Sequence, residues 1–524
     1  MAAEQQADIR TLDQIPGYWA ARQRDAVAMR FGDRDTTYAE LDAASNRIAN
    51  ALIADGLKPG DRIALLARNT DLFFTLLFGA IKAGVVLVPV NFRLAPPEVA
   101  FVVADAEARM LFVDEVHAGL VETIEADLAG VRRIIDLDGV RPRWTAYAAW
   151  CAAAPARDPA IGAKRDWVAI QMYTSGTTGH PKGVQLSHHN LLINLERAVV
   201  EWDDWRTGDV NLVCMPLYHI AGSAWGLVGL YAGCRNIILA DVDPPEILRL
   251  IARERVTKVL FVPAVILFLL QTPACAETDF SSLELVIYGA SPIPANLLRR
   301  AVETFGCRFA QVYGLTETTG AITYLEPEDH DPKGSDRMAS CGKAMSGVEI
   351  RIVDQAGHEV ATGEVGEIIC RSAQVMPGYW NLPEANAKAI RDGWFHSGDV
   401  GYLDQDGYLY IHDRIKDMII SGGENIYPAE VESALFEHGD VADVAVIGVP
   451  DEKWGEAVKA VVVPRDGADL SDQDLILFAR QRIAGYKVPR SVDFVATLPR
   501  NPSGKILKRE LRAPYWRDQE RGVH

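Results

Sequence analysis

The side chains best suited to chemistry lie in one short stretch, Tyr173-Thr-Ser-Gly-Thr-Thr-Gly-His-Pro-Lys-Gly183. This stretch combines hydroxyl groups, glycines and one lysine directly after an apolar run, Val168 to Met172. Glycines let backbone N–H groups approach an anion, hydroxyls donate further hydrogen bonds, and Lys182 adds positive charge. The stretch therefore predicts a phosphate-binding loop. A flexible surface turn is the alternative, and a Walker A loop is excluded because Pro181 and Gly183 replace residues which that motif requires.

Later segments carry further reactive side chains. Met215-Pro-Leu-Tyr-His-Ile-Ala-Gly222 places a histidine in an apolar run, and Gln311-Val-Tyr-Gly-Leu-Thr-Glu-Thr318 groups an aromatic ring, hydroxyls and a carboxylate. Gly393-Trp-Phe-His-Ser-Gly-Asp399 ends in a Gly-Asp turn, and Pro502-Ser-Gly-Lys-Ile506 carries a lysine near the C-terminus. Taken alone, each has an ordinary structural explanation: a core histidine, a helix cap over a buried aromatic, a structural turn and a solvated lysine.

Alternating strand and helix patterns must position these segments. Thr37-Tyr-Ala-Glu40 is a capping-box pattern that opens an amphipathic helix through Leu52, and the strand-like run Arg62 to Leu66 follows. The same alternation returns later, with a strand expected at Lys258 to Val262 and a helix at Ala295 to Phe305. Strands that alternate with helices predict layered α/β sheets with largely parallel strands.

The pattern changes in the last third of the chain. Beyond about Glu349, short alternating runs between Gly- and Asp-containing turns predict a β-rich subdomain. From Asp417 onward, a compact α+β pattern predicts a small separate domain. We therefore expect a large N-terminal α/β domain over residues 1–415, with the β-rich subdomain inside it, and a small α+β C-terminal domain over residues 416–524.

Composition excludes several classes of protein. The net charge of −18, from 53 Lys and Arg against 71 Asp and Glu, argues against a nucleic-acid binder, because a phosphate backbone would be repelled. The 7 cysteines contain no C-x-x-C pair, which fits reduced thiols in a cytoplasm. Met1 to Ile9 is polar and lacks the apolar core of a signal peptide. The apolar run Leu72 to Val90 is interrupted by Lys82 and Pro89, so we expect buried elements and no membrane span.

The order and spacing of these segments resemble the adenylate-forming superfamily of acyl-CoA synthetases, adenylation domains and luciferases. The resemblance runs from about Thr37 to Lys508 and is closest to bacterial fatty-acyl-CoA synthetases and 4-coumarate:CoA ligase-like enzymes. Further matching segments are Tyr288-Gly-Ala-Ser-Pro292, Tyr410-Ile-His-Asp-Arg414 and Ser421-Gly-Gly-Glu-Asn-Ile426. The resemblance implies ATP, Mg²⁺ and coenzyme A as ligands, a small-molecule carboxylic acid as substrate, and a C-terminal domain that is mobile.

The resemblance also assigns the ATP site. Its residues would be Thr174, Ser175, Gly176, Thr177, Thr178, Gly179, Lys182, Gly289, Ala290, Ser291, Gln311, Tyr313, Gly314, Thr316, Glu317, Asp399, Arg414 and Lys505. Tyr313 offers a face on which adenine can stack, and Thr316 can donate to the α-phosphate. Glu317 supplies the carboxylate oxygen that Mg²⁺ prefers, and Asp399 and Arg414 would bind the ribose. Ser397 departs from the family's usual threonine and keeps the hydroxyl.

The remaining assignments concern the acid, the thiol and the movement between domains. By resemblance, His219, Gly314 and Trp225 line the acid pocket, although Trp225 is equally compatible with an ordinary core position. The resemblance implies that Lys505 acts on the reacting carboxylate and α-phosphate, together with His219 and Thr316 as catalytic residues. It places the hinge at Lys416. Gly422 and Gly423 would face coenzyme A, with a simple hairpin turn as the alternative.

These features together predict an ATP-dependent acid:CoA ligase that forms an acyl-adenylate and then an acyl-CoA. A fatty acid is the first expectation for the substrate, with an aryl or hydroxycinnamic acid as the alternative. An amino-acid-activating adenylation domain of a peptide synthetase is disfavoured, because the His219 segment begins Met-Pro-Leu and lacks the aspartate that such domains present to the substrate amine. A stand-alone adenylation enzyme is a further, less favoured alternative. The motifs are also compatible with luciferase-like oxygenation, whereas a non-enzymatic nucleotide sensor is disfavoured because Glu317 and Lys505 are both present. The oligomeric state stays open, with a homodimer among the options.

Overall fold

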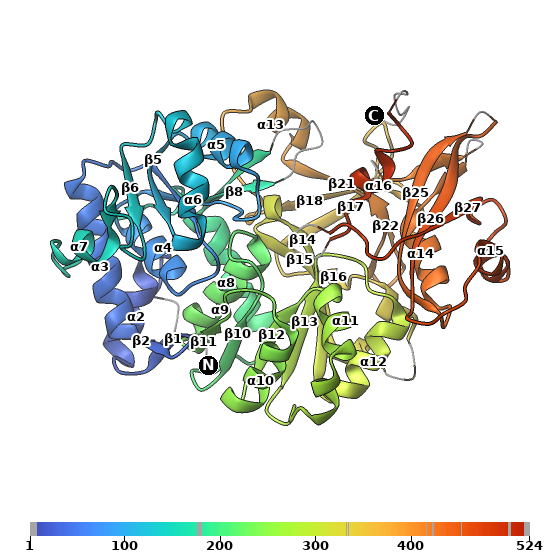
Figure 1. Ribbon diagram of the computed structural model, residues 1–524, viewed down its shortest axis with the longest axis horizontal. Coiled ribbons are helices and arrows are strands. Elements are labelled where there is room, and N and C mark those ends of the chain that lie inside the picture. Colours follow the sequence, from blue (N-terminus) through green and yellow to red (C-terminus); the bar gives the residue numbers. More distant parts are fainter. Residues whose placement is uncertain are drawn as a thin grey trace.

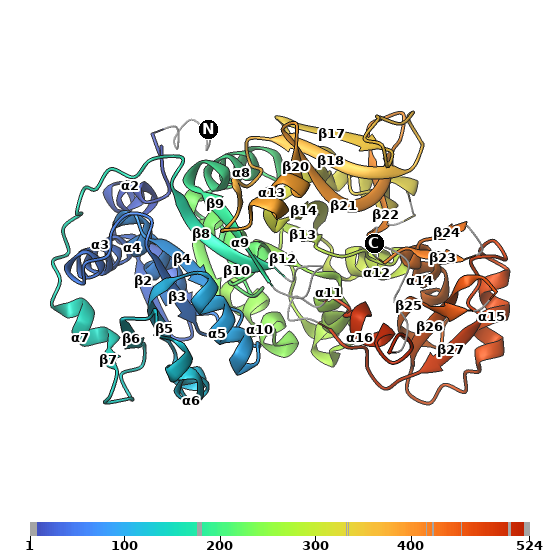
Figure 2. The same ribbon diagram turned by 90° about the horizontal axis from the view of Figure 1, so that it is seen from above.

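The computed structural model describes residues 8–174, 181–331, 333, 335–414, 417–421, 424–451, 453–500 and 505–517. Two large mixed sheets and one small sheet form most of the chain, and a separate α+β domain follows at the C-terminal end (Figures 1 and 2). The predicted fold class, layered α/β sheets with a β-rich subdomain and a C-terminal domain, is confirmed.

An eight-stranded sheet occupies the N-terminal part of the molecule, in the order β19-β9-β8-β4-β3-β5-β6-β7. Its strands are parallel from β8 to β7, and β9 and β19 extend it in antiparallel pairing. The strands are β3 (Arg62–Leu66), β4 (Val86–Pro89), β5 (Ala108–Val113), β6 (Arg133–Asp136), β7 (Thr145–Ala146), β8 (Val168–Thr174), β9 (Lys182–Ser187) and β19 (Gly378–Tyr379). The helices of this part are α3 (Tyr38–Ala54), α4 (Leu72–Lys82), α5 (Pro96–Asp105), α6 (Glu115–Ile124) and α7 (Tyr147–Ala152).

Local sequence signals explain where several of these elements begin. The Thr37 side chain accepts from the Glu40 backbone N–H at 3.2 Å, and the Glu40 carboxylate accepts from the Thr37 N–H at 2.8 Å, so the expected capping box opens α3. The apolar run from Leu72 to Val90 divides into the buried helix α4 and strand β4. Within the described residues, no helix is long and apolar enough to cross a membrane.

A nine-stranded sheet forms the second half of the large domain, in the order β16-β15-β14-β13-β12-β10-β11-β1-β2. The strands are parallel from β14 to β1 and antiparallel at both edges. They are β1 (Val27–Phe31), β2 (Arg34–Thr37), β10 (Val210–Val213), β11 (Arg235–Ile238), β12 (Lys258–Phe261), β13 (Leu285–Gly289), β14 (Arg308–Leu315), β15 (Gly320–Leu325) and β16 (Lys343–Ala344). The helices are α2 (Gln14–Arg22), α8 (His188–Glu201), α9 (Ile220–Ala232), α10 (Pro244–Glu254), α11 (Pro263–Gln271) and α12 (Ala295–Phe305).

The β-rich subdomain is an antiparallel five-stranded sheet. It contains β17 (Val348–Val353), β18 (Gly366–Ser372), β20 (Ile390–Arg391), β21 (Trp394–Leu403) and β22 (Leu409–Arg414), and α13 (Pro383–Ala389) precedes β20. The strands β21 and β22 carry two residues that were predicted to bind ribose, Asp399 and Arg414, and these residues are paired directly across the two strands.

The C-terminal domain is a five-stranded sheet with helices and lies at one end of the molecule in both views (Figures 1 and 2). Its elements are β23 (Ile419–Ser421), β24 (Glu424–Ile426), α14 (Pro428–Phe436), β25 (Val441–Asp451), β26 (Gly455–Pro464), α15 (Asp472–Arg480), β27 (Ser491–Phe494) and α16 (Lys508–Arg512). Its described contacts with the large domain include a stack of His412 on Tyr427, with centroids 4.7 Å apart, and a hydrogen bond from Asn296 to the Phe436 carbonyl at 3.5 Å.

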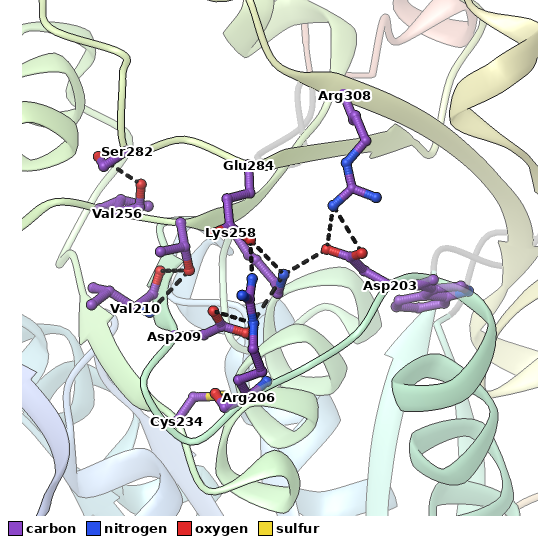
Figure 3. A network of polar contacts seen from close by, with 12 residues as sticks. Asp203, Arg206, Asp209, Val210, Cys234, Val256, Lys258, Ser282, Glu284 and Arg308 are labelled. Carbon is purple, nitrogen blue, oxygen red and sulfur yellow. Dashed lines mark hydrogen bonds and ion pairs between the residues drawn. The ribbon is translucent and has the colours of Figure 1, made fainter. Parts of the chain in front are cut away.

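An ion-pair network lies at the N-terminal ends of strands in the nine-stranded sheet (Figure 3). Lys258, the first residue of β12, is fully buried, and its ammonium lies 2.6 Å from Asp203 and 3.5 Å from Asp209. Arg308, the first residue of β14, also bonds Asp203 at 2.8 Å. Although burial favours the neutral acid, the hydrogen bond from Lys258 holds the pKa of Asp203 below its ordinary value.

This network holds in place the segment between α8 and β10. Asp203 lies between Trp202 and Trp205 in that segment, and the Lys258 ammonium lies 5.5 Å from the Trp205 ring centroid. The Tyr324 hydroxyl donates to the Trp202 carbonyl at 2.9 Å. Both tryptophans are therefore held in fixed positions between α8 and β10.

Candidate active site

The predicted phosphate loop joins the two strands of a hairpin. Thr174 at the end of β8 pairs with Lys182 at the start of β9, so both ends of the loop lie side by side. Among the residues predicted to bind phosphate, Ser175, Gly176, Thr177, Thr178 and Gly179 lie outside the described residues. The structure thus places the lysine of the motif at the beginning of a strand, beside the strand from which the loop departs.

Tyr379 connects this lysine to the predicted metal ligand. Its hydroxyl donates to the Glu317 carboxylate at 2.9 Å, and the Lys182 ammonium lies 5.0 Å from the centroid of its ring. The strand β19 pairs Tyr379 with Val184 of β9, and the Met376 N–H donates to the Glu317 carbonyl at 2.8 Å. Burial, together with the Glu317 carboxylate, raises the pKa of Tyr379 well above its ordinary value. Tyr379 therefore remains a hydrogen-bond donor at neutral pH.

Sequence reasoning missed Tyr379. Its one local signal is the Pro377-Gly378 dipeptide before it, which predicts a turn and says nothing about a partner 62 positions away. The pairing of β19 with β9 brings it into the site, and such long-range pairing is invisible in the local pattern.

The surroundings of Glu317 are compatible with its predicted role as a ligand of Mg²⁺. It lies in a one-turn helix, Thr316–Thr318, that directly follows β14. Among the described residues there is no cluster of three or more His, Cys, Asp or Glu side chains suited to a metal ion. Mg²⁺ commonly binds through one or two carboxylates and completes its shell with water and substrate phosphates, so a single fixed carboxylate suits it.

Close backbone approaches shape the predicted nucleotide slot. A β-carbon on Gly289 would lie 2.2 Å from the Val312 carbonyl oxygen, and one on Gly314 would lie 1.8 Å from the Gly320 oxygen, so neither position accepts a side chain. Ala290 has φ of +68°, a left-handed conformation that turns the chain sharply after β13 before Ser291. The predicted slot therefore lies at the C-terminal ends of β13 and β14, the usual ligand edge of a parallel sheet.

Tyr313 and Asp399 are joined directly although they lie 86 positions apart. The Tyr313 hydroxyl donates to the Asp399 carboxylate at 2.7 Å, and Asp399 is only 4% exposed. Burial and the Asp399 carboxylate raise the pKa of Tyr313 well above its ordinary value. Gln311, two positions before Tyr313, is buried, and its amide lies 3.6 Å from the Cys341 sulfur. The side chain of Arg414 lies outside the described residues.

The turn that presents Asp399 is held by its own hydroxyl and a neighbouring carboxylate. Ser397 donates to the Ile368 carbonyl at 2.6 Å and accepts from the Asp399 N–H at 3.0 Å. Glu367 accepts from the Gly398 N–H at 3.2 Å and bonds the His396 ring at 2.8 Å. Serine in place of the family's usual threonine therefore supplies the required hydroxyl.

His219 stands at the beginning of α9, as the residue that caps the helix. The residue is half-buried, and its Nε2 atom is enclosed and has no hydrogen-bond partner among the described residues. Burial, with Arg93 nearby, lowers the pKa of His219 to about 4, so the ring is neutral at pH 7. A neutral imidazole with an unused nitrogen is suited to a hydrogen bond with a bound acid.

Trp225 lies on α9, six residues after His219, and forms one side of a cluster of three tryptophans. Its ring stacks on Trp202 with centroids 6.4 Å apart and meets the edge of Trp205 at 5.2 Å. Its indole N–H donates to the Leu212 carbonyl at 3.0 Å, and the side chain is 2% exposed. Trp225 is therefore rigidly held, whether it acts as core or as the wall of a pocket.

The C-terminal domain carries the predicted catalytic lysine. Lys505 is half-buried and precedes Ile506, which pairs with Arg500 in a short antiparallel bridge. The next lysine, Lys508, begins α16 and lies 2.9 Å from Glu432. The predicted hinge residue Lys416 and the predicted coenzyme A residues Gly422 and Gly423 lie outside the described residues.

Comparisons with known proteins identify the family of this chain. The model of the AMP-binding enzyme family matches residues 18–380, and that of the AMP-binding enzyme C-terminal domain matches residues 430–505. A fatty acid–[acyl-carrier-protein] ligase from Streptomyces coeruleorubidus is 40% identical over 98% of each chain. A feruloyl-CoA synthase from an Amycolatopsis species is 42% identical over 95% of this chain and 99% of its own.

A solved structure is also similar over nearly the full length. The crystal structure of an anthranilate CoA ligase in complex with anthranoyl-AMP superimposes with a TM-score of 0.90 at 27% identity, covering 96% of this chain and 97% of that one. Because the family model covers most of the chain and relatives above 30% identity span almost all of it, the chain belongs to the AMP-binding enzyme family.

Proposed function

We propose that this protein is an ATP-dependent, AMP-forming acid:CoA ligase. It joins a carboxylic acid to ATP as an acyl-adenylate with release of pyrophosphate, and then transfers the acyl group to the thiol of coenzyme A with release of AMP. The observation that carries the proposal is the convergence of Lys182 and Glu317 on Tyr379, beside the Tyr313–Asp399 pair. A cation at the start of β9 in the eight-stranded sheet thus lies close to the carboxylate that follows β14 in the nine-stranded sheet, and in this proposal the two hold the phosphates and Mg²⁺ of ATP.

The negative charges of the two reactants determine what the site must do in the first step. A carboxylate that attacks the α-phosphate brings two anions together, so the site must neutralise and align them. Lys182, at the start of β9, would contact the phosphates, and the Thr316 hydroxyl, directly after β14, would donate to the α-phosphate. Mg²⁺ on Glu317 would neutralise further phosphate charge. His219, neutral at pH 7, would hold the acid carboxylate, and Lys505 would be delivered by the C-terminal domain.

The second step replaces one anhydride bond with a thioester. The thiol attacks the acyl carbon, the C–O bond to AMP breaks, and the thiol proton leaves to solvent. Lys505 must withdraw to admit the thiol, so we propose a rotation of the C-terminal domain about Lys416 that brings Gly422 and Gly423 to the thiol entrance. Such a rotation would break the described contacts between the domains, which include the His412–Tyr427 stack and the Asn296 hydrogen bond to the Phe436 carbonyl.

The same proposal includes the boundaries of the two domains and the cellular location of the protein. We assign the adenylation domain to residues 1–415 and the mobile domain to residues 416–524, which agrees with family matches that end at residue 380 and resume at residue 430. We propose a cytoplasmic location, because all seven cysteines are free thiols, as expected in a reducing compartment.

The proposed acid is a fatty acid, with an aryl or hydroxycinnamic acid as the second candidate. The relatives support both, because one is named for fatty acids and another for ferulate. The name of the first relative also makes a carrier-protein thiol the alternative acceptor. A screen of both acid classes, with AMP and thioester measured in the presence of coenzyme A, tests the function. ADP in place of AMP, or no product from any acid, would refute it.

We expect Tyr379→Phe to raise the Mg²⁺ concentration required for half-maximal adenylation by about tenfold, the scale of losing a hydrogen bond to a metal ligand. The phenyl ring keeps its contact with Lys182, so the KM for ATP at saturating Mg²⁺ should change little. Tyr379→Leu is the matched control, because it also removes the ring and should raise both values. Identical Mg²⁺ curves for the wild-type and Phe proteins would show that Tyr379 does not orient Glu317.

We propose that Trp225 closes the far end of the acid pocket, held there by Trp202, Trp205 and the Leu212 carbonyl. Trp225→Gly should shift the preference towards acids longer by a few carbons, because each added methylene contributes about 0.8 kcal/mol, or several-fold in kcat/KM. Its melting temperature should also fall, since the cluster loses a ring. A destabilised variant with an unaltered chain-length profile would instead make Trp225 an ordinary core residue.

A further inference from the structure

Asp105, the last residue of α5, bonds two side chains from other parts of the chain. Its carboxylate accepts from the Tyr173 hydroxyl at 2.6 Å, and its carbonyl accepts from the Trp380 indole N–H at 3.0 Å. Carbonyls in the last turn of a helix have no partner within the helix, so the indole supplies one that this helix end requires. Asp105 therefore joins residues that are 68 and 275 positions away from it in the sequence.

The first of these contacts reaches the beginning of the predicted phosphate loop. Tyr173 directly precedes Thr174, the residue from which the loop departs. Its hydroxyl also accepts from the Gln171 amide at 3.1 Å, so it is fixed by two hydrogen bonds. Burial, together with the Asp105 carboxylate, raises the pKa of Tyr173 well above its ordinary value. The hydroxyl therefore remains a donor to Asp105 throughout the physiological pH range.

The second contact reaches the end of the same loop. The Trp380 backbone N–H donates to the Gly183 carbonyl at 2.8 Å, and Gly183 directly follows Lys182. The Arg62 guanidinium lies 3.7 Å from the centroid of the Trp380 ring, a cation–π contact that helps to hold the indole in place. Both ends of the loop are thus connected to Asp105, one through Tyr173 and the other through Trp380.

The two ends of the loop also pack on each other. Tyr173 pairs with Gly183 across β8 and β9. A β-carbon on Gly183 would lie 3.1 Å from the Tyr173 ring and 2.7 Å from the Gln171 amide nitrogen, so the ring and the amide lie close against this glycine. A displacement of Tyr173 would therefore also displace Gly183, and with it Lys182.

We propose that Asp105 is a positioning residue of the phosphate site. Through Tyr173 and Trp380 it fixes Thr174 and Lys182 where they bind the pyrophosphate part of ATP. Groups that are held in place before the ligand arrives bind it without the cost of ordering them. Loosening these two ends should therefore weaken the binding of the pyrophosphate part and leave the contacts to adenosine intact. This inference rests on the proposed ligase function.

The test compares the affinities of the purified protein for ATP and for AMP, measured by titration calorimetry with Mg²⁺ and without acid. Tyr173→Phe removes only the hydroxyl. We expect this variant to bind ATP about tenfold more weakly, the scale of one lost hydrogen bond to a charged group. Its affinity for AMP, which carries no pyrophosphate, should stay within about twofold of the wild-type value. A merely structural hydrogen bond would lower the melting temperature and leave the ratio of the two affinities unchanged.

Substitutions of Asp105 test the other side of the same contact. Asp105→Leu removes the acceptor and should weaken ATP binding as much as Tyr173→Phe does. Asp105→Asn keeps an oxygen that accepts from Tyr173, so its affinity for ATP should stay within about twofold of the wild-type value. Adding Tyr173→Phe to Asp105→Leu should weaken ATP binding no further, because both substitutions remove one shared hydrogen bond.

Tyr38→Phe is the matched control. The Tyr38 hydroxyl is buried in α3 and donates to the Cys234 carbonyl at 2.8 Å. Its loss should lower the melting temperature as Tyr173→Phe does, whereas the ratio of ATP to AMP affinity should stay that of the wild type. If Tyr173→Phe fails to fold, Trp380→Phe serves for the same comparison, because it removes the indole donor to the Asp105 carbonyl.

The outcomes separate this inference from the proposed function. An unchanged ratio of ATP to AMP affinity in Tyr173→Phe, or an equal loss of affinity for both nucleotides, overturns the role of Asp105 and leaves the ligase function standing. The affinities are measured without acid, so they do not depend on turnover. A wild-type protein that binds ATP but releases no pyrophosphate with any acid refutes the ligase function itself.

Discussion

Lys505→Ala is expected to slow acyl-adenylate formation by about a hundredfold or more, the scale of losing one charged contact to the transition state. The lysine would neutralise the carboxylate and the α-phosphate only while the anhydride forms. Thioester formation from a supplied acyl-adenylate should therefore remain close to the wild-type rate. Rapid-quench measurement of pyrophosphate in the first half-reaction, and of acyl-CoA in the second, separates the two effects.

Lys508→Ala provides the control for this experiment. Lys508 lies three positions further along and pairs with Glu432 inside the C-terminal domain at 2.9 Å. The two side chains are only 14% and 19% exposed, so loss of the pair should lower the melting temperature, while adenylation by the folded variant should stay within about twofold of the wild-type rate. Equal losses in both half-reactions of Lys505→Ala, or the same loss in Lys508→Ala, would contradict the assignment.

Lys416→Pro is expected to abolish most acyl transfer to coenzyme A, by about a hundredfold, while adenylation persists. Proline fixes φ near −65° and removes one backbone donor, so a chain that must rotate at this position cannot pass between two conformations. The half-reactions can be measured as for Lys505. Lys416→Ala keeps the freedom of φ and should transfer the acyl group normally. A folded Pro variant with normal thioester turnover would remove Lys416 from the hinge.

Local sequence signals were sufficient for much of the fold. The capping box at Thr37 predicted the beginning of α3, and the apolar periodicity predicted α12 at Ala295–Phe305 with both ends correct. The predicted strand at Lys258 to Val262 ends one residue earlier in the structure, at Phe261. Alternation of strands and helices was enough to predict parallel sheets, because a parallel pair requires a crossover that a helix normally supplies.

The details of the candidate site depended on contacts that no local pattern encodes. Tyr379 meets Glu317 because β19 adds to β9, and Tyr313 meets Asp399 through packing of the β-rich subdomain on the nine-stranded sheet.

The acid pocket links these observations to the chemistry of the substrate. Trp225, Trp202 and Trp205 form an apolar cluster, and the Lys258 ammonium lies 5.5 Å from the Trp205 ring centroid. As the proposed wall of the acid pocket, this cluster would limit the length of the acid.

The protein is expected to activate an acid as an adenylate before any thiol enters. Exchange of labelled pyrophosphate into ATP, measured with acid, Mg²⁺ and the purified protein but without coenzyme A, tests this claim most directly. We expect exchange that depends on the acid and disappears in Lys505→Ala. Exchange that requires coenzyme A, or its absence with every fatty and aryl acid offered, would contradict the account.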